Sequence, residues 1–230
     1  MTVTTMNIDI YVGIVQFIVL LLSLSIHESA HAWSADALGD PTARYLGRVS
    51  LNPMVHADFL GTIVFPLIGA FSGFMFGWAK PVPVNLSRLK NPARDHMLIA
   101  AAGPASNLLI AAVLFTCLMV MKSISTEGAD AINRVAYAEL TGQSILIPLT
   151  AVAYYGVIIN IILAVFNLIP VAPLDGAAVL SGLLPRSFSW ILDSMQSYGI
   201  ILLVALIYLG IPGMVYGPVL DFVLSYLLAI

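Results

Sequence analysis

Long apolar stretches separated by short polar connections make up most of the chain. A helix that crosses the hydrocarbon core of a bilayer needs about 20 apolar residues, at about 1.5 Å per residue. We expect transmembrane helices in the stretches of that length, which are residues 10–33, 96–121, 145–169, 190–209 and 211–230. The last two are separated by a break rich in Gly and Pro, so they predict a helical hairpin.

Residues 59–78 are also apolar, but Gly and Pro residues interrupt them repeatedly. Irregular backbone at membrane depth is tolerated only where protein shields it from lipid. The loops on both sides, residues 34–57 and 79–94, carry Arg and Lys, which places both of them in the cytoplasm by the positive-inside rule. We therefore expect residues 59–78 to re-enter the membrane without crossing it, and the N-terminus to lie outside.

The polar residues 122–144 then form an external loop, with a short surface helix expected around residues 130–140. The pattern as a whole predicts an all-α polytopic membrane protein. It would have about five transmembrane helices, one Pro/Gly-broken re-entrant segment, and short extended or β segments in the cytoplasmic-side loops.

Composition excludes several classes of protein. Of the 230 residues, 60% are hydrophobic and 9% charged, with a mean hydropathy of +0.99, which is incompatible with a water-soluble globule. The net charge of -3, without a basic stripe, excludes a nucleic acid partner. One cysteine cannot form a disulfide framework or a thiolate zinc cluster. No G-x-x-x-x-G-K-[ST] motif indicates a nucleotide.

A sequence with metal-binding spacing, His27-Glu28-Ser29-Ala30-His31, lies near the end of the first apolar stretch. Helical residues four apart lie on one face, so both imidazoles can bind one zinc ion at about 2.0–2.1 Å. Glu28 projects towards the open coordination position, where it can take a proton from zinc-bound water. A packed polar patch is the alternative, but titratable groups inside a membrane segment cost several kcal/mol unless paired. We predict His27 and His31 as ligands and Glu28 as general base.

A hydrolytic zinc site needs a third protein ligand. Glu127 and Glu139 belong to the expected external loop, across the membrane from the histidines. Three aspartates near the cytoplasmic face fit ordinary loop positions: Asp36, Asp40 and Asp58. Asp175 instead follows a Pro-rich break in an apolar segment, where an unpaired carboxylate would be expensive. It could cap the helix that follows, but the histidine pair favours a ligand role.

This choice of ligand also tests the topology. The histidines lie near the inner end of the first helix, so the segment that ends at Asp175 must run in the same direction. An odd number of crossings must separate the two, and residues 96–121 supply one. Residues 59–78 should therefore not cross, as the distribution of Lys and Arg already indicates.

These residues resemble the site-2 proteases, a family of intramembrane zinc metalloproteases (M50-type). Beside HExxH, residues 167–176 (NLIPVAPLDG) are similar to the family's second motif, N-x-x-P-x-x-x-L-D-G. Residues 47–53, 77–85 and 103–107 resemble the compact branch that has no inserted PDZ domain. The resemblance covers residues 13–184 and implies His27, His31 and Asp175 as zinc ligands and Glu28 as base. It also implies a role for Asn167, whose amide N–H could stabilise an oxyanion.

The function that follows is hydrolysis of peptide bonds in or near transmembrane segments of other membrane proteins, as in regulated intramembrane proteolysis. We expect one Zn²⁺ per chain, a transmembrane protein substrate, a bilayer environment such as the cell membrane, and a site towards the cytoplasmic side. Residues 1–230 would form one domain, with a catalytic core at 13–184 and a C-terminal helical hairpin at 185–230. The extended segments 45–51 and 81–85 could pair with an unwound substrate.

Several alternatives stay open at this point. A metal-ion transporter or channel also places His and Asp in the membrane, but it leaves Glu28 and residues 167–176 unexplained. A different membrane zinc peptidase would take its third ligand from Glu127 or Glu139. An inactive scaffold descended from a protease is a third alternative. Asn167 could instead form a helix-break hydrogen bond near Pro170. For Asn107 we favour a purely structural role, in which it locks helices together, over a role in catalysis.

Overall fold

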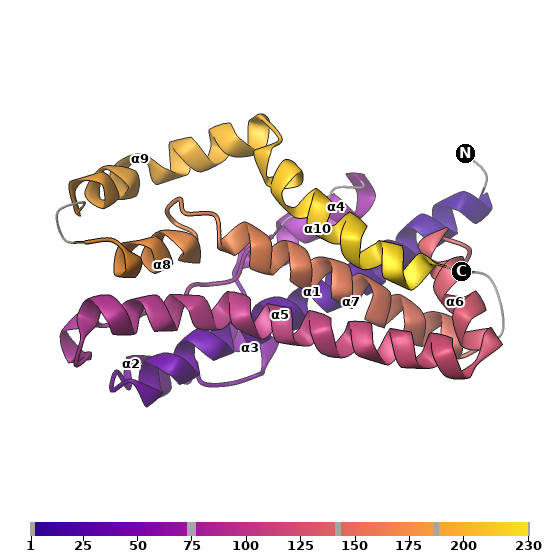
Figure 1. The fold of residues 1–230 in the computed structure, drawn as a ribbon, viewed down its shortest axis with the longest axis horizontal. Coiled ribbons are helices and arrows are strands. Elements are labelled where there is room, and N and C mark those ends of the chain that lie inside the picture. The colour runs from indigo at the N-terminus through magenta and orange to yellow at the C-terminus, as the bar shows by residue number, and fades with distance from the viewer. Residues whose placement is uncertain (1–2, 73–76, 141–143, 186–188, 230) are drawn as a thin grey trace.

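The computed structural model describes residues 3–72, 77–140, 144–185 and 189–229. Every regular element among these residues is a helix (Figure 1). We expected short extended or β segments at residues 45–51 and 81–85, but the described residues contain no β-strand. Residues 77–85 have no regular secondary structure. The all-α class is thus confirmed.

Three long helices form the centre of the molecule: α1 (Val3–Ala37), α5 (Pro92–Ile124) and α7 (Leu146–Asn167). They pack against one another along the long axis in Figure 1. Small residues allow close approach: a Cβ added at Gly156 of α7 would lie 2.5 Å from Leu114 Cδ1 of α5. Pro92 occupies the first turn of α5, where its missing N–H costs no helical hydrogen bond.

One end of this bundle is filled mainly by apolar side chains. They come from the three central helices together with α6 (Thr126–Ala136) and α10 (Ile211–Leu228). Its fully or nearly fully buried members include Leu118, Ile132, Ala151, Val157 and Leu227. We call this cluster the apolar half of the bundle. It anchors the three helices on which the candidate site is built.

Helix α6 starts earlier than the expected 130–140. The Ser125 hydroxyl accepts a hydrogen bond from Gly128 N at 3.2 Å and so begins the helix at Thr126. Ala138, with φ +57°, follows its end. The helix is also not a bare surface element, because Ile132 and Val135 lie in the apolar half.

The segment at residues 59–78 doubles back on itself. It begins with a π-helical turn, η1 (Phe59–Val64), and continues as α4 (Phe65–Ser72). Its two ends meet, because Trp78 N donates to Gly61 O at 3.0 Å and the Thr62 hydroxyl donates to Trp78 O at 2.8 Å. The structure therefore agrees with re-entry: a chain that returns to its starting point does not cross a bilayer.

Short helices lie in the loops that precede and follow this segment in the sequence. They are α2 (Thr42–Tyr45), α3 (Pro53–His56) and the 3₁₀ turn η2 (Leu86–Arg88). The loop layer they form is tied together by buried polar side chains. Arg48, for example, is buried and donates to the carbonyls of Val55 and Lys80.

The remaining helices are α8 (Asp175–Leu183) and α9 (Ser189–Tyr208), followed by α10. Helix α8 packs on α5, and α10 on α7. In Figure 1 α10 leads away from α9, so the two helices of the expected C-terminal hairpin contact different parts of the bundle. They meet at Gly210, whose φ of +71° is readily adopted by glycine.

Four helices of the described residues are long and apolar enough to cross a membrane: Ile10–Ala37, Pro92–Ile124, Leu146–Asn167 and Ile211–Leu228. We expected about five. The fifth, residues 190–209, corresponds to α9, whose described apolar part, Tyr198–Tyr208, is shorter than a span. The rest of that stretch lies outside the residues whose surroundings the structure describes. A polytopic membrane protein is confirmed.

Candidate metal centre

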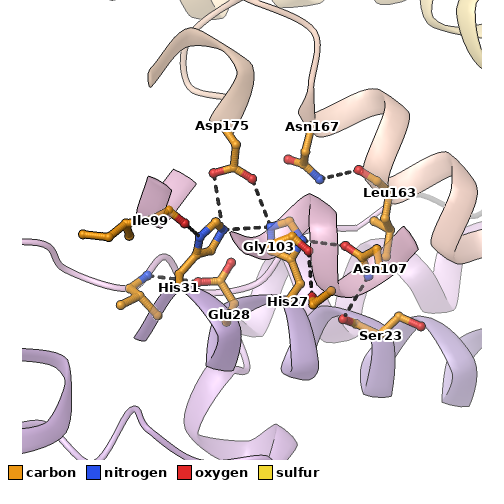
Figure 2. A network of polar contacts seen from close by, with 12 residues as sticks. Ser23, His27, Glu28, His31, Ile99, Gly103, Asn107, Leu163, Asn167 and Asp175 are labelled. Atoms are coloured by element: carbon orange, nitrogen blue, oxygen red, sulfur yellow. Dashed lines mark hydrogen bonds and ion pairs between the residues drawn. The ribbon is translucent and has the colours of Figure 1, made fainter. Parts of the chain in front are cut away.

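Both histidines of the HExxH sequence are buried on the face of α1 that packs against α5. His27 is 4% and His31 8% exposed. One helical turn separates them, so their rings meet edge to face and their Nε2 atoms lie 3.0 Å apart. The predicted pair is thus brought together with both Nε2 atoms pointing to one place (Figure 2).

Asp175 reaches the same place from the other side of the site. Helix α7 ends at Asn167, the chain turns through the Pro-rich break, and Asp175 opens α8. Its Oδ2 lies 3.1 Å from His27 Nε2 and its Oδ1 3.3 Å from His31 Nε2. The capping alternative is not seen: Leu174 is the N-cap of α8, and no side chain caps that helix. The expected match in depth between the histidines and Asp175 is therefore confirmed.

The three side chains fit a zinc ion. Their donor atoms lie within 4.8 Å of one another. In a tetrahedral zinc site, bonds of about 2.0–2.2 Å place neighbouring ligand atoms about 3.3 Å apart, close to the separations observed here. Asp175 Oδ2 is also buried without a hydrogen-bond partner in the described part of the chain. A cation between the two imidazoles and the carboxylate would compensate that oxygen.

Each imidazole is held from behind through its Nδ1 atom. His31 Nδ1 lies 2.7 Å from the Ile99 carbonyl oxygen of α5. His27 Nδ1 lies 2.6 Å from Oδ1 of Asn107, which follows Gly103 on α5 by about one helical turn. Oxygen acceptors at both Nδ1 atoms keep the protons there and leave the Nε2 lone pairs for a metal.

Gly103 of α5 lies directly against both rings. A Cβ added there would be 2.4 Å from His31 Nε2 and 2.6 Å from His27 Cε1, distances that no real Cβ shows. The backbone of α5 therefore forms a wall of the site, and only glycine leaves room for the imidazoles.

Glu28 lies on the opposite side of the histidines from Asp175 in Figure 2. Its side chain is half-buried, and its Oε2 accepts a hydrogen bond from Val82 N at 3.0 Å. Val82 belongs to the irregular segment 77–85, which passes across the site at this point. Figure 2 shows the carboxylate near the His31 ring, and a backbone amide that the sequence did not single out holds it there.

Asn167 lies at the C-terminal end of α7. Its Nδ2 donates to the Leu163 carbonyl at 2.9 Å, one turn back along the helix (Figure 2). This is the helix-end hydrogen bond that we considered as the alternative to an oxyanion role. The amide lies on the same side of the site as Asp175 but is engaged with its own helix.

Sequence reasoning missed a set of buried polar side chains behind His27. Asn107 and Asn160 are 0% and 1% exposed, and Asn107 Nδ2 donates to Asn160 Oδ1 at 2.8 Å. Asn160 Nδ2 in turn donates to the Ser23 hydroxyl at 2.9 Å. The available signal was an asparagine in the middle of an apolar stretch, which must find a partner inside the membrane. Asn107 does lock helices together, as we expected, but it also holds His27.

The other carboxylates we considered lie elsewhere. Glu127 is in the first turn of α6, at the far end of α5 from the site in Figure 1, and Glu139 follows that helix. Asp40 accepts a hydrogen bond from the loop amide of Asn85, Asp58 caps η1, and Asp36 pairs with Arg44. Within the described residues, only Asp175 joins the histidines in a metal-binding group.

Comparison with known proteins agrees with this site. The family model described as Peptidase family M50 matches residues 15–210. A relative from Bacillus subtilis (strain 168), named "Putative zinc metalloprotease YwhC", is 34% identical over 204 residues, covering 89% of this chain and 84% of the relative. Another, "Putative zinc metalloprotease Rip2" from Mycolicibacterium smegmatis, is 26% identical over 200 residues, covering 86% and 68%. No solved structure matches.

These findings decide between the classes of protein left open by the sequence. A family match that covers most of the chain, together with relatives named as zinc metalloproteases, excludes the metal-ion transporter as the better interpretation. The donor set of two imidazoles and one carboxylate suits zinc as the cofactor. The chain belongs to peptidase family M50, the site-2 protease family, and is an integral-membrane zinc metalloprotease.

Proposed function

We propose that this protease hydrolyses peptide bonds in or near transmembrane segments of other membrane proteins. The observation that carries the proposal is the position of the metal-binding group. His27 and His31 lie within an apolar helix long enough to cross a membrane, and α5, which covers them, is another. A transmembrane substrate already lies within the bilayer, where these helices place the histidines, whereas a water-soluble substrate would have to enter it.

Each residue of the site is assigned a role in hydrolysis from its position. His27, His31 and Asp175 would hold Zn²⁺, which when bound supplies a Lewis acid and lowers the pKa of a water ligand. Glu28 lies near the His31 ring and would serve as general base, accepting a proton at its carboxylate. The Val82 amide holds that carboxylate through Oε2. The other oxygen, Oε1, is then the atom that takes the proton.

Asn167 is proposed to stabilise the oxyanion that develops on the scissile carbonyl. For this role its Nδ2 must leave the Leu163 carbonyl and turn towards the substrate. The exchange is feasible because Leu163 and Asn167 both belong to α7, so the Leu163 carbonyl still accepts the backbone N–H four residues later. Replacing Asn167 should therefore lower kcat and leave the free energy of unfolding nearly unchanged.

The segment 81–85 is proposed to bind the unwound substrate strand, together with residues 45–51. Pro81 and Pro83 have no N–H, and the amides of Val82 and Asn85 donate to Glu28 and Asp40. The segment therefore offers mainly carbonyl acceptors to a substrate. Its prolines also prevent pairing with another copy of itself.

The site is proposed to face the cytoplasm, with the protein in the cell membrane. The loops that surround the metal-binding group carry most of the cations of the chain: Arg44, Arg48, Lys80, Arg88 and Lys90. By the positive-inside rule this end of the bundle is cytoplasmic. We further propose that residues 13–184 form the catalytic core and 185–230 an accessory helical region within one domain.

The test compares the detergent-purified chain with its Glu28→Gln variant on a panel of single-span membrane proteins, with bound zinc quantified in both. We expect cleavage by the parent only and one zinc per chain in both, because the base is lost while the ligands remain. Glu127→Gln is the matched control, since it removes a carboxylate at the far end of α5 and should cut normally.

Two outcomes would contradict the proposal. Equal cleavage by Glu28→Gln and the parent would exclude Glu28 as base. Cleavage of soluble unfolded proteins but of no membrane-embedded segment would leave the protease assignment intact and remove the intramembrane substrate.

A further inference from the structure

The buried amide chain behind His27 has one possible direction of hydrogen bonds. It starts at a backbone group of α7, the Gly156 carbonyl, which can only accept. Asn160 Nδ2 donates to that carbonyl at 2.8 Å and to the Ser23 hydroxyl at 2.9 Å. With both amide protons used there, Asn160 must present its Oδ1 to the remaining neighbour.

That neighbour is Asn107, and the direction carries through it. Asn107 Nδ2 donates to Asn160 Oδ1 at 2.8 Å, which leaves Asn107 Oδ1 facing His27 Nδ1 at 2.6 Å. An oxygen acceptor requires the proton of a neutral imidazole to sit on Nδ1. The Nε2 lone pair of His27 then points at the metal position.

We infer that Asn107 and Asn160 are positioning residues that fix the tautomer and orientation of His27 for zinc. Both are buried where helices α1, α5 and α7 meet. Partners of this kind raise the basicity of a metal-binding histidine and hold its ring, and their loss costs about 10–100-fold in metal affinity. The inference rests on the proposed assignment of His27 as a zinc ligand.

The two histidines differ in how they are fixed. His31 Nδ1 faces the Ile99 backbone carbonyl, which is an acceptor whatever the side chain at position 99. His27 depends on side chains from two other helices. Substitutions that remove the amide chain should therefore act through His27 alone.

The experiment measures zinc affinity by competition with a chromophoric chelator in detergent. Asn107→Leu should lose about 10–100-fold and Asn160→Leu about tenfold, because in the latter Asn107 remains but its orientation is no longer fixed. Asn107→Asp keeps an oxygen at Nδ1 but can no longer donate to Asn160 Oδ1, so its zinc affinity should fall less than that of Asn107→Leu. Thr150→Val is the control: Thr150 is 1% exposed on α7 but contacts Met121 and not this chain of amides, so zinc affinity should not change.

Affinity of Asn107→Leu within about twofold of the parent, in a folded protein, would overturn the inference, as would equal losses in Asn107→Leu and Asn107→Asp. His27→Ala separates this from the proposed site. Parental zinc affinity in His27→Ala would refute His27 as a ligand, whereas loss there with retention in Asn107→Leu would refute only the positioning role.

A second measurement needs no variant and covers the case in which a substitution prevents folding. The zinc-free parent, labelled with ¹⁵N-histidine, should give a protonated, hydrogen-bonded Nδ1 signal for His27. A proton on Nε2 of His27 instead would overturn the inference.

Discussion

The two ends of the same three-helix bundle are held together by different forces. In the apolar half, α1, α5 and α7 meet through side chains such as Val19, Leu118 and Val157, which pack without direction. At the other end, which we call the site half, the same helices meet through Ser23, His27, Asn107, Asn160 and the bare backbone at Gly103. There the polar contacts each depend on particular atoms, beside a small apolar cluster that includes Leu24 and Leu163.

The difference teaches where this chain can tolerate change. Apolar packing is distributed over many weak contacts, so a single loss lowers stability but leaves the arrangement in place. A polar contact inside a membrane protein has a defined partner, and changing one atom leaves the partner unsatisfied. Substitutions in the site half should thus act on zinc and catalysis, and those in the apolar half on stability.

The largest effect is expected for Asp175→Asn, which replaces the carboxylate ligand by a neutral amide. Zinc affinity should fall by more than the 10–100-fold typical of an outer partner, and cleavage should fall with it. Asp130→Asn is the control, since that carboxylate lies on α6 and is largely exposed. The assignment is wrong if Asp175→Asn keeps its zinc while a variant at Glu127 or Glu139 loses it.

Gly103→Ala adds one methyl group to the site half. The new Cβ would stand 2.4 Å from His31 Nε2, so the imidazoles or α5 must shift. A displacement of about 1 Å in a catalytic group costs about 100-fold in rate, and we expect cleavage to fall by that order. In Gly217→Ala of α10, nothing lies within 4 Å of the added Cβ, so this control should cut normally. Parental activity in Gly103→Ala would show that the site half is softer than its contacts indicate.

Leu118→Ala makes a larger change of volume in the apolar half. Leu118 is 2% exposed, and its truncation leaves a cavity that should cost about 2–5 kcal/mol of stability. Zinc affinity and the activity of the folded fraction should not change. Leu109→Ala, on the same helix but 66% exposed, should alter stability by less than about 0.5 kcal/mol. Thermal unfolding in detergent with zinc quantified would check both, and loss of zinc in Leu118→Ala would erase the contrast between the two halves.

The sequence predicts those features that follow from short residue spacings or from the free-energy cost of burying a polar group. His27 and His31 share a helix face because they are four residues apart, and Asp175 stands out because a carboxylate in that apolar context needs compensation. The return of residues 59–78 followed from the charges on both sides and from the need to match depths, and the Trp78–Gly61 contact agrees with it.

What the sequence does not predict depends on how the helices are rotated about their axes. Asn107 and Asn160 are 53 positions apart, and their contact exists only because α5 and α7 turn these faces together. The Val82–Glu28 hydrogen bond likewise depends on the path of an irregular segment. Residue types indicated that each asparagine needed a partner but not which partner it would find.

The smallest effect is expected in the loop layer, at Asp40. This buried carboxylate accepts hydrogen bonds from Thr42 N at 3.1 Å and from Asn85 N at 2.6 Å, so it holds the end of the segment whose Val82 contacts Glu28. Burial raises the pKa of Asp40, but the Thr42 and Asn85 hydrogen bonds and the charge of Arg88 outweigh it and lower that pKa below 3.8.

A carboxyl group whose pKa is lower in the folded than in the unfolded chain contributes stability that is fully present above the unfolded pKa of 3.8 and is lost as the pH falls through the folded value. Asp40→Asn should therefore be about 1–2 kcal/mol less stable than the parent at pH 7, with a gap that narrows below pH 3.8. Unfolding midpoints of both proteins at pH 7 and in acid would measure it. A gap that stays constant with pH would mean that Asp40 acts through its shape and not its charge, and that the loop layer resembles the apolar half more than the site half.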